Sequence, residues 1–544
     1  MRVALLSNIN MNGTIRHLKR NMDVYSVEGY GNEIGTLMNP MSSIYDYDPD
    51  IIFIVNDLLE LLEHNICIED AEKIMDEWFH NLSSAIHQDI IYYISDAVLF
   101  GKELDVLTDT SIKADIEYTW QNKLDHFVKN HPNARIFPYK QLIEKVGFDN
   151  SFSMKMWYMG KVIHSQAMQQ LISDKIVYLA SIETRSPKKV LALDLDNTLW
   201  GGLAGEDDIK PVVLSDDHTG LAYKNLQRVI KAMKDQGVIL VIVSKNNEDD
   251  AKNIIENHPH MILRLDDFAD TRINWENKAK NLKEIAEDLN IGLDSIVFFD
   301  DSATERQIIK DMLPDVVVSS FPDAPEDLAD KMIELWRQYF SKPVVTAEDK
   351  NKTVQYQENK KRDIFKKEAL SFEEYLKGLE IVLARISEKE NLERATQLLN
   401  KTNQFNLTTK RHTINEIQGI VSDRTHKMFV YRASDRFGDY GIIAVTISRI
   451  VSDVFYIDEF VMSCRVMGKN IENAILEDME EWAKKQGCRF VIGKYVETTK
   501  NLPVKFFYPN MGYEKIESSG EFKVSLTDKL ERDYRLKKIV EEDM

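Results

Sequence analysis

The spacing of apolar residues changes along the chain, and the first pattern covers residues 1–183. Apolar runs at residues 2–7 and 48–57 have the length of buried strands, and the stretch 68–86 has the apolar period of a helix. Strands that alternate with helices in this way predict a small α/β domain.

A second pattern, from residue 184 to 345, alternates strands and helices more regularly. The expected elements are, in order, a strand at 189–196, a helix at 220–237, a strand at 238–245, a helix at 249–257, a strand at 261–265, a helix at 277–290 and a strand at 295–301. This order predicts a doubly wound, Rossmann-like parallel sheet, whose ligands bind at the carboxyl ends of its strands.

The last part of the chain has a third pattern, separated from the second by a charged segment. Residues 346–374 are poor in apolar residues, which is typical of a linker or a solvated helix. Residues 375–526 contain four strand-like runs and an amphipathic helix at 470–487, which predict a mixed α/β domain with a hairpin-rich sheet. Residues 527–544 are expected to form a charged tail. The predicted fold class is therefore α/β, with several domains.

Charge and composition narrow the possible partners. The chain has 544 residues and a formal net charge of −20, from 69 Lys and Arg against 89 Asp and Glu, so nucleic acid is not an expected partner. Its three cysteines are far apart and lie in no metal or redox spacing. A signal-peptide core and a membrane-spanning apolar stretch are both missing from the sequence. We therefore expect a cytoplasmic protein with no membrane partner.

The strongest local signal for chemistry is the pair Asp194 and Asp196, which follows the apolar residues 190–193. On its own, such a pair is more often part of a solvated loop. Further along, Asp300 and Asp301 end another apolar strand, and adjacent carboxylates there repel each other unless a cation lies between them and the first pair. Mg²⁺ prefers hard oxygen ligands, so these residues favour a magnesium site.

Two more residues of this series suit phosphate chemistry. Ser244 ends the second strand, where a hydroxyl and a backbone N–H can hold a phosphoryl oxygen, although a lone serine there is more often a helix cap. Lys278 opens a helix, where its ammonium group can neutralise phosphoryl charge. Lys280 is a nearby alternative, and a lysine in this setting is otherwise an ordinary surface residue.

Together, these residues resemble the four motifs of the haloacid dehalogenase (HAD) superfamily. The resemblance implies a Mg²⁺-dependent phosphatase in which Asp194 attacks phosphorus to form an aspartyl-phosphate, while Asp196 protonates the leaving group and then activates water. The implied phosphate-binding residues are Thr198, Ser244, Asn246 and Lys278. The implied metal ligands are Asp194, the carbonyl group of Asp196, and Asp301 in preference to Asp300. The loop 200–208 is too short for a lid domain, so a large or carrier-bound substrate fits an open site.

Longer stretches narrow the resemblance to the FkbH-like proteins, often called HAD-IIIC phosphatases. They are LDLDNTLWGGLAGEDD, VSKNNEDDA, LLNKTNQFNLTTKR, YIDEFVMSCRVMGKNIE and FFYPNMGY, and the similarity runs from about Trp157 to Gly512. This family takes 1,3-bisphosphoglycerate, removes phosphate and loads a glyceryl group on the phosphopantetheine thiol of an acyl carrier protein, for polyketide-type biosynthesis. The resemblance therefore implies a carrier protein and a small phosphorylated substrate as partners.

The last domain of FkbH-like proteins is similar to Gcn5-related N-acetyltransferases (GNAT), which splay two strands to hold a pantetheine arm. Here Arg465, Gly468 and Lys469 partly match the pyrophosphate loop of those enzymes, and are the implied pantetheine-binding residues. Asn470 stands where Gly or Ala is usual, which weakens the case for acetyl-CoA and leaves pantetheine open.

Cys464 is a candidate acyl-enzyme nucleophile. It follows a strand, lies beside Arg465 and precedes a helix start, where a cation and a helix dipole would lower the pKa of a thiol. The alternative is a small buried apolar residue.

The first domain resembles the SGNH-hydrolase-like segment of many such proteins, with Ser7 after the first strand and His164 as the catalytic pair. Lys161 replaces the usual Asp three residues before the histidine, and no GDS turn surrounds Ser7. This domain is therefore expected to be degenerate.

Two other functions remain open from the sequence. One is a plain phosphatase acting on a small metabolite or a protein, with Cys464 merely structural. The other is a non-catalytic scaffold that docks carrier proteins, which would not need the paired carboxylates. An acidic carrier needs a basic patch, and the candidates are Lys360, Lys361, Arg362, Lys366 and Lys367, or Lys410 and Arg411, unless these form a solvated helix face.

Overall fold

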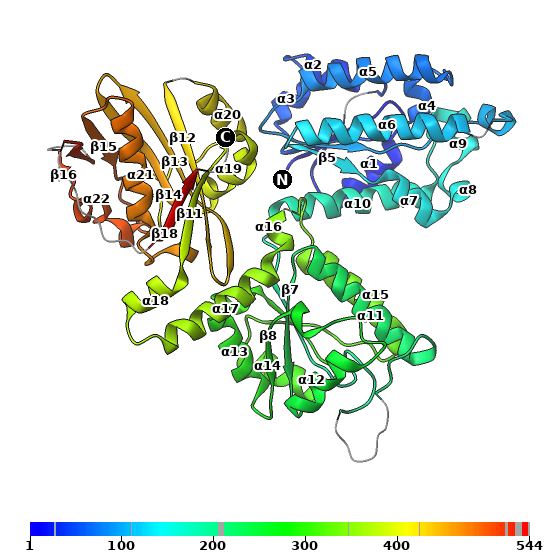
Figure 1. Cartoon of the computed structure of the whole chain (residues 1–544). Coiled ribbons are helices and arrows are strands. Elements are labelled where there is room, and N and C mark those ends of the chain that lie inside the picture. Colours follow the sequence, from blue (N-terminus) through cyan, green and yellow to red (C-terminus); the bar gives the residue numbers. More distant parts are fainter. Residues whose placement is uncertain are drawn as a thin grey trace. The chain divides into compact units, whose positions relative to one another are not determined.

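The computed structural model describes residues 1–26, 29–109, 111–204, 212–345, 347–423, 425–516, 520–527 and 536–541 (Figure 1). The loop 200–208 was expected to be too short for a lid domain. Its residues 205–208 lie outside the described residues. The chain divides into two compact units, Met1–Pro187 with Tyr339–Val344, and Lys188–Gln338 with Val345–Met544. Among the described residues, no helix combines the length and the apolarity needed to cross a membrane.

The first unit contains a parallel sheet of five described strands in the order β2-β1-β3-β4-β5. Its strands are β1 (Val3–Leu6), β2 (Val24–Ser26), β3 (Ile51–Ile54), β4 (Ile91–Ser95) and β5 (Ala134–Phe137). Its helices are α1 (Asn12–Leu18), α2 (Glu33–Met38), α3 (Ser43–Tyr47), α4 (Leu58–Leu61), α5 (Ile68–Ala85), α6 (Ser111–Asn130), α7 (Tyr139–Val146), α8 (Phe148–Ser151), α9 (Met154–Gly160) and α10 (Gln166–Thr184). Because both faces of the sheet are covered by apolar clusters, its strands are continuous apolar runs.

The central domain contains a second parallel sheet of five described strands, in the order β10-β9-β6-β7-β8. Its strands are β6 (Val190–Leu193), β7 (Ile239–Ser244), β8 (Phe268–Ile273), β9 (Ile296–Phe299) and β10 (Val317–Val318). Its helices are α11 (His218–Asp235), α12 (Glu248–Asn257), α13 (Lys278–Asp288), α14 (Ala303–Met312) and α15 (Leu328–Leu335). The predicted alternation of strands and helices is confirmed, and β6 lies in the middle of the sheet.

Strand β8 begins later in the sequence than the apolar pattern predicts. The run 261–265 was expected to be a strand, but it is irregular, and β8 begins only at Phe268. Met261 and Leu263 are nevertheless buried, so burial rather than pairing explains their apolar character. The true strand contains Asp270, whose carboxylate is paired with Arg272 and with Lys360, at distances of 3.0 and 2.5 Å.

Residues 347–379 form α16 (Ala347–Lys350), α17 (Lys352–Glu368) and α18 (Phe372–Leu379). Helix α17 contacts the central domain, because the Gln357 side-chain amide donates hydrogen bonds to the carbonyl groups of Asp266 and Phe268, at 3.1 and 2.9 Å. It also contacts the last domain, since Arg362 is 3% exposed and donates two hydrogen bonds to Asp435, at 2.7 and 2.9 Å. Arg362 is therefore not available for a basic docking patch.

The last domain contains a mixed sheet of eight described strands in the order β16-β17-β15-β14-β13-β12-β11-β18. Its strands are β11 (Ile381–Ile386), β12 (His426–Asp435), β13 (Gly438–Val451), β14 (Val454–Met462), β15 (Phe490–Lys494), β16 (Glu514–Lys515), β17 (Glu521–Ser525) and β18 (Leu536–Glu541). Its helices are α19 (Leu392–Lys401), α20 (Ile414–Ser422), α21 (Ile471–Lys485) and α22 (Phe507–Asn510). Most neighbours are antiparallel, while the pairs β14–β15 and β11–β18 are parallel. Strand β18 comes from the segment expected to be a charged tail.

Candidate active site

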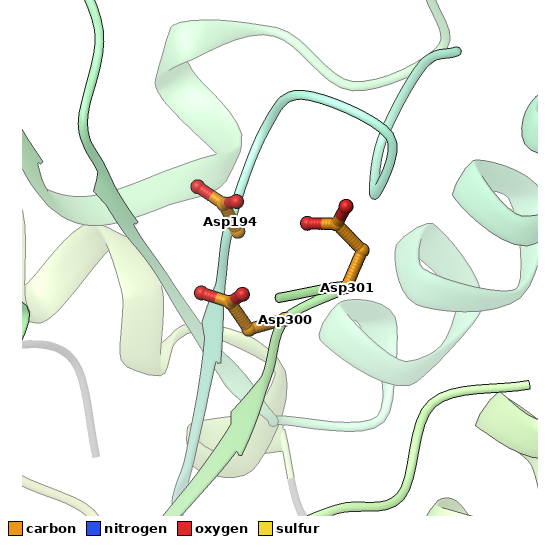
Figure 2. A group of neighbouring side chains, drawn as sticks. All are labelled: Asp194, Asp300 and Asp301. Carbon is orange, nitrogen blue, oxygen red and sulfur yellow. The ribbon is translucent and has the colours of Figure 1, made fainter. Parts of the chain in front are cut away.

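Three carboxylates meet at the carboxyl edge of the central sheet. Strands β6 and β9 are neighbours with Leu193 opposite Phe299, so Asp194 and the pair Asp300 and Asp301 leave the sheet side by side. The Asp194 amide donates a hydrogen bond of 3.1 Å to the Phe299 carbonyl group, which fixes this exit. One oxygen of each carboxylate lies within 4.8 Å of the others, and Figure 2 shows how the three side chains lie.

Lys278 is the cation of this cluster. It is the first residue of α13, whose start is capped by the Asn277 side chain, and it is only 3% exposed. Its Nζ lies 2.9 Å from Asp194 Oδ1 and 2.6 Å from Asp300 Oδ2. Burial acts to lower the pKa of Lys278, but the two carboxylates outweigh it and leave that pKa above its usual value. Lys278 therefore stays charged.

Asp300 and Asp301 have different surroundings. Asp300 is fully buried, and its carboxylate accepts hydrogen bonds from Lys278 and from the Ser302 amide, so its oxygens are already engaged. Asp301 is half-buried, and burial and the Asp194 charge raise its pKa. Arg306 donates to the carbonyl groups of both residues, at 2.7 and 2.6 Å, and thereby holds the turn. The more open Asp301 is the better placed of the two for a metal.

The donor set fits a hard divalent cation. The three carboxylates carry more negative charge than the single ammonium group of Lys278 balances. Asp194 Oδ1 is buried and accepts no hydrogen bond from the described residues, although Lys278 lies within ion-pair distance of it. Carboxylate oxygens of this kind are what Mg²⁺ takes as ligands. Asp194 and Asp301 would hold the ion.

Asp196 lies in a separate hydrogen-bond network beside the cluster. Its Oδ1 accepts hydrogen bonds from Trp200 Nε1 and the Ala204 amide, at 2.9 and 3.1 Å, and its Oδ2 accepts one from Asn246, at 2.9 Å. Burial raises the pKa of Asp196, which suits a group that must carry a proton. The contact of Trp200 with Asp196 has no signal in the sequence, because a tryptophan beside an acidic motif is usually a packing residue.

Two implied phosphate-binding residues lie near these groups. Ser244 ends β7, next to β6, and is 2% exposed, while α12 is capped by Asn247 instead. Thr198 is fully buried, and its hydroxyl has no hydrogen-bond partner in the described part of the chain. Their contact with phosphate stays a prediction.

Cys464 contributes no ligand to the carboxylate cluster and lies in the last domain. It is exposed, in a short turn that follows β14, so the alternative of a buried apolar residue is wrong. The helix expected at 470–487 begins at Ile471, which is too far along the chain from Cys464 for the helix dipole to act on the thiol. Arg465 directs its guanidinium to Ser463 and to Gln355 of α17, at 3.2 and 2.9 Å.

The expected hydrolase residues of the first domain bond to other partners. The Ser7 hydroxyl donates to the Val55 carbonyl group, at 2.5 Å. His164 is buried, hydrogen-bonded to the Tyr139 hydroxyl at 2.7 Å, and burial lowers its pKa to about 3. Lys161, in place of an Asp, lies near Glu60 at 3.5 Å.

Comparison with known proteins gives a partial match. No protein-family pattern matches this sequence, and a search of curated proteins found no match. Among solved structures, the chain is similar to the N-terminal part of the protein BF1531 from Bacteroides fragilis, which contains a phosphatase domain and was solved in complex with Mg. The two are 27% identical, with a TM-score of 0.52, over 63% of this chain and 94% of that one.

Smaller overlaps exist with two acetyltransferases. The ribosomal-protein-S18-alanine N-acetyltransferase from Escherichia coli is 11% identical, with a TM-score of 0.22, over 28% of this chain and 99% of its own. A GNAT-family protein from Desulfovibrio desulfuricans is 10% identical, with the same TM-score, over 27% and 99%. The match with BF1531, together with the carboxylate cluster, shows that this chain contains a domain similar to a magnesium-complexed phosphatase domain.

Proposed function

We propose that the protein is a Mg²⁺-dependent phosphatase that also loads an acyl group on a carrier protein, as the resemblance to FkbH-like proteins implies. The observation that carries the proposal is the cluster of Asp194, Lys278, Asp300 and Asp301 at the carboxyl edge of the central sheet. The substrate class is an acyl phosphate that also bears a phosphate ester, such as 1,3-bisphosphoglycerate.

The phosphatase step uses residues that the structure brings together. Asp194 Oδ attacks phosphorus, the bond between phosphorus and the leaving oxygen breaks, and Asp196 gives that oxygen its proton. Asp196 then takes a proton from water, which attacks the aspartyl-phosphate and releases inorganic phosphate. Lys278 stays charged and offsets the negative charge of the phosphoryl group. Mg²⁺ bound by Asp194 and Asp301 would neutralise more of that charge.

The acyl step belongs to Cys464. Its thiolate attacks the acyl carbon of the acyl phosphate, a C–S bond forms, the C–O bond to phosphate breaks, and phosphate leaves with the electron pair. A pantetheine thiol then takes the acyl group by thioester exchange, which is nearly isoenergetic. The exposure of Cys464 supports this role, because a carrier must reach it. Gly468 of the following loop would face the carrier's phosphate, while the ammonium group of Lys469 stays bonded to the Arg465 carbonyl group.

Helix α17 supports the coupling of the two steps within one unit. Tyr356 packs against the apolar core of the central domain, and its pKa is raised first by burial and also by the nearby Cys464. The same helix therefore touches the phosphatase domain and the surroundings of the cysteine.

The test is to incubate the full chain with Mg²⁺, 1,3-bisphosphoglycerate and a phosphopantetheinylated carrier protein, and to weigh both proteins by mass spectrometry. We expect a hydroxylamine-labile mass increase on the Cys464 peptide and a loaded carrier. Cys464→Ala should lose loading and keep phosphate release at Asp194. Cys67→Ala, which removes the other exposed cysteine, is the matched control and should load normally.

Other results would favour the alternatives. If Cys464→Ala loads the carrier at the wild-type rate, the acyl-enzyme is wrong and transfer is direct. If the wild type releases phosphate but loads no carrier, the protein is a plain phosphatase. If it does neither and still binds a carrier, it is a scaffold.

A further inference from the structure

Strands β14 and β15 run together for only part of their length. They are paired from Val454 opposite Phe490 to Ile457 opposite Gly493, and β14 then continues to Met462 without β15 beside it. This domain is expected to resemble the GNAT acetyltransferases. Those enzymes hold a pantetheine arm between two parallel strands that splay apart. The question is what occupies the opening between the two strands here.

A segment of the chain itself lies in this opening. Residues 405–407, between α19 and α20, run antiparallel to β14: the Leu407 amide donates to the Phe460 carbonyl group at 3.1 Å, and the Met462 amide donates to the Phe405 carbonyl group at 2.9 Å. On the other side, the Val496 amide, just beyond β15, donates to the Leu407 carbonyl group at 2.8 Å. The segment therefore bridges both edges of the opening.

Buried side chains hold the segment in place. Phe405 is 3% exposed and Leu407 is fully buried, and both belong to the main apolar core of the domain. Asn501 is also fully buried, and its side-chain amide donates to the carbonyl groups of Asn406 and Val496, at 2.8 and 2.9 Å. Removing the segment would leave buried polar groups without partners, which is costly.

The pyrophosphate loop that should accompany a pantetheine arm is also engaged. Arg465 binds Gln355 of α17, and Lys469 donates to the Arg465 carbonyl group at 3.1 Å while its Nζ lies over the Tyr440 ring. Asn470 precedes α21 with a φ of 57°. Two separate parts of the expected binding site are thus filled by the chain's own residues.

We propose that residues 405–407 permanently fill the opening between β14 and β15, so that this domain holds neither CoA nor a pantetheine arm between these strands. The domain is then not an acyl-CoA-dependent acetyltransferase. This inference goes beyond the proposed function, because it applies whether or not the chain loads a carrier.

The test follows amide hydrogen exchange of the full chain at Leu407 and Met462, with and without millimolar CoA. We expect both amides to be strongly protected in the free protein and unchanged by CoA. If calorimetry detects CoA binding but the exchange of these two amides does not change, the inference is also supported, because CoA then binds outside the opening. Weak protection in the free protein, or a change at both amides on adding CoA, would overturn it.

A variant tests what holds the segment. Asn501→Ala should lower the protection of the Leu407 amide by about tenfold or more, because four side-chain hydrogen bonds are lost. Asn510→Ala changes an exposed asparagine of the same region and should leave that protection unchanged. Equal protection in wild type and Asn501→Ala would show that the segment is not held as described. The wild-type experiment stands even if the variant does not fold.

Discussion

The first domain and the central domain contain similar parallel sheets but treat the acids at their strand ends differently. In the first domain, Asp57 follows β3 and accepts a hydrogen bond from the Glu60 amide, and Asp96 follows β4 and accepts one from the Lys140 amide. Each acid is bonded by its own backbone donor. In the central domain, Asp194, Asp300 and Asp301 face one another instead, with a single lysine among them.

This difference shows that a position at the end of a parallel strand does not by itself make a carboxylate reactive. The groups that contact the carboxylate decide whether it can bind a ligand. A carboxylate that accepts a hydrogen bond from a backbone amide, as Asp57 does at the start of α4, has less left to offer a ligand. Carboxylates that face each other remain short of positive charge, and that deficit is what a metal ion and a phosphoryl group can use.

Asp194→Asn should lower phosphate release by at least about 10³-fold, because an amide keeps the shape of the side chain but cannot attack phosphorus. Thermal unfolding should show an intact fold. Asp235→Asn, an exposed position at the end of α11, is the control and should keep full activity. Near-normal turnover by folded Asp194→Asn would exclude the covalent mechanism.

Removal of divalent metal with EDTA should stop phosphate release, and added Mg²⁺ should restore it, because the cluster is short of positive charge. Asp301→Ala should raise the Mg²⁺ concentration needed for half-maximal rate, as measured by titration. Full activity in metal-free buffer would contradict the assignment of this site.

Asp57→Asn should stabilise the first domain by about 1 to 3 kcal/mol at pH 7. Burial raises the pKa of Asp57 to about 6, above its value in the unfolded chain, so the folded domain loses stability as the pH rises from about 4 to about 6. Asparagine removes that cost and can still cap α4. Hydrogen exchange of the β3 amides should show the gain at pH 7 and little difference near pH 4.

Ser7→Ala should have no effect on ester hydrolysis, which we expect to stay at background in the wild type as well. The Ser7 hydroxyl donates to a carbonyl group, and His164 binds Tyr139 instead of a carboxylate. Assays with short acyl esters would check this. Hydrolysis that is clear in the wild type and lost in Ser7→Ala would show that the first domain is active.

The sequence predicts those parts of the fold whose signal is local. Strands β6, β7 and β9 are continuous apolar runs, and the carboxylates that follow β6 and β9 lie together, as the sequence indicates. Strand β8 was misplaced because Asp270 and Arg272 interrupt its pattern, and their partners lie elsewhere, on α13 and α17. A strand that contains charged residues looks like a loop in the sequence when the residues that neutralise those charges lie far along the chain.

Features that depend on long-range pairing were not predictable. Nothing in residues 405–407 shows that they pair with β14, more than fifty positions later in the chain. The distinction between Asp300 and Asp301 was made from the family pattern, and the structure adds its physical cause, since Asp300 is engaged by Lys278 and Ser302. Residue types and order suffice to name the residues of the carboxylate cluster, whereas the surroundings of each residue need coordinates.

Helix α17 also has a consequence for how the chain can be divided. Strand β8 is the last strand on its side of the central sheet, and Gln357 bonds to the Asp266 and Phe268 carbonyl groups along this edge. A fragment that ends at residue 345 would expose the β8 edge, and unpaired strand edges promote self-association. A fragment that ends at residue 369 would keep the edge covered, so the boundary useful for expressing the phosphatase domain alone lies after α17.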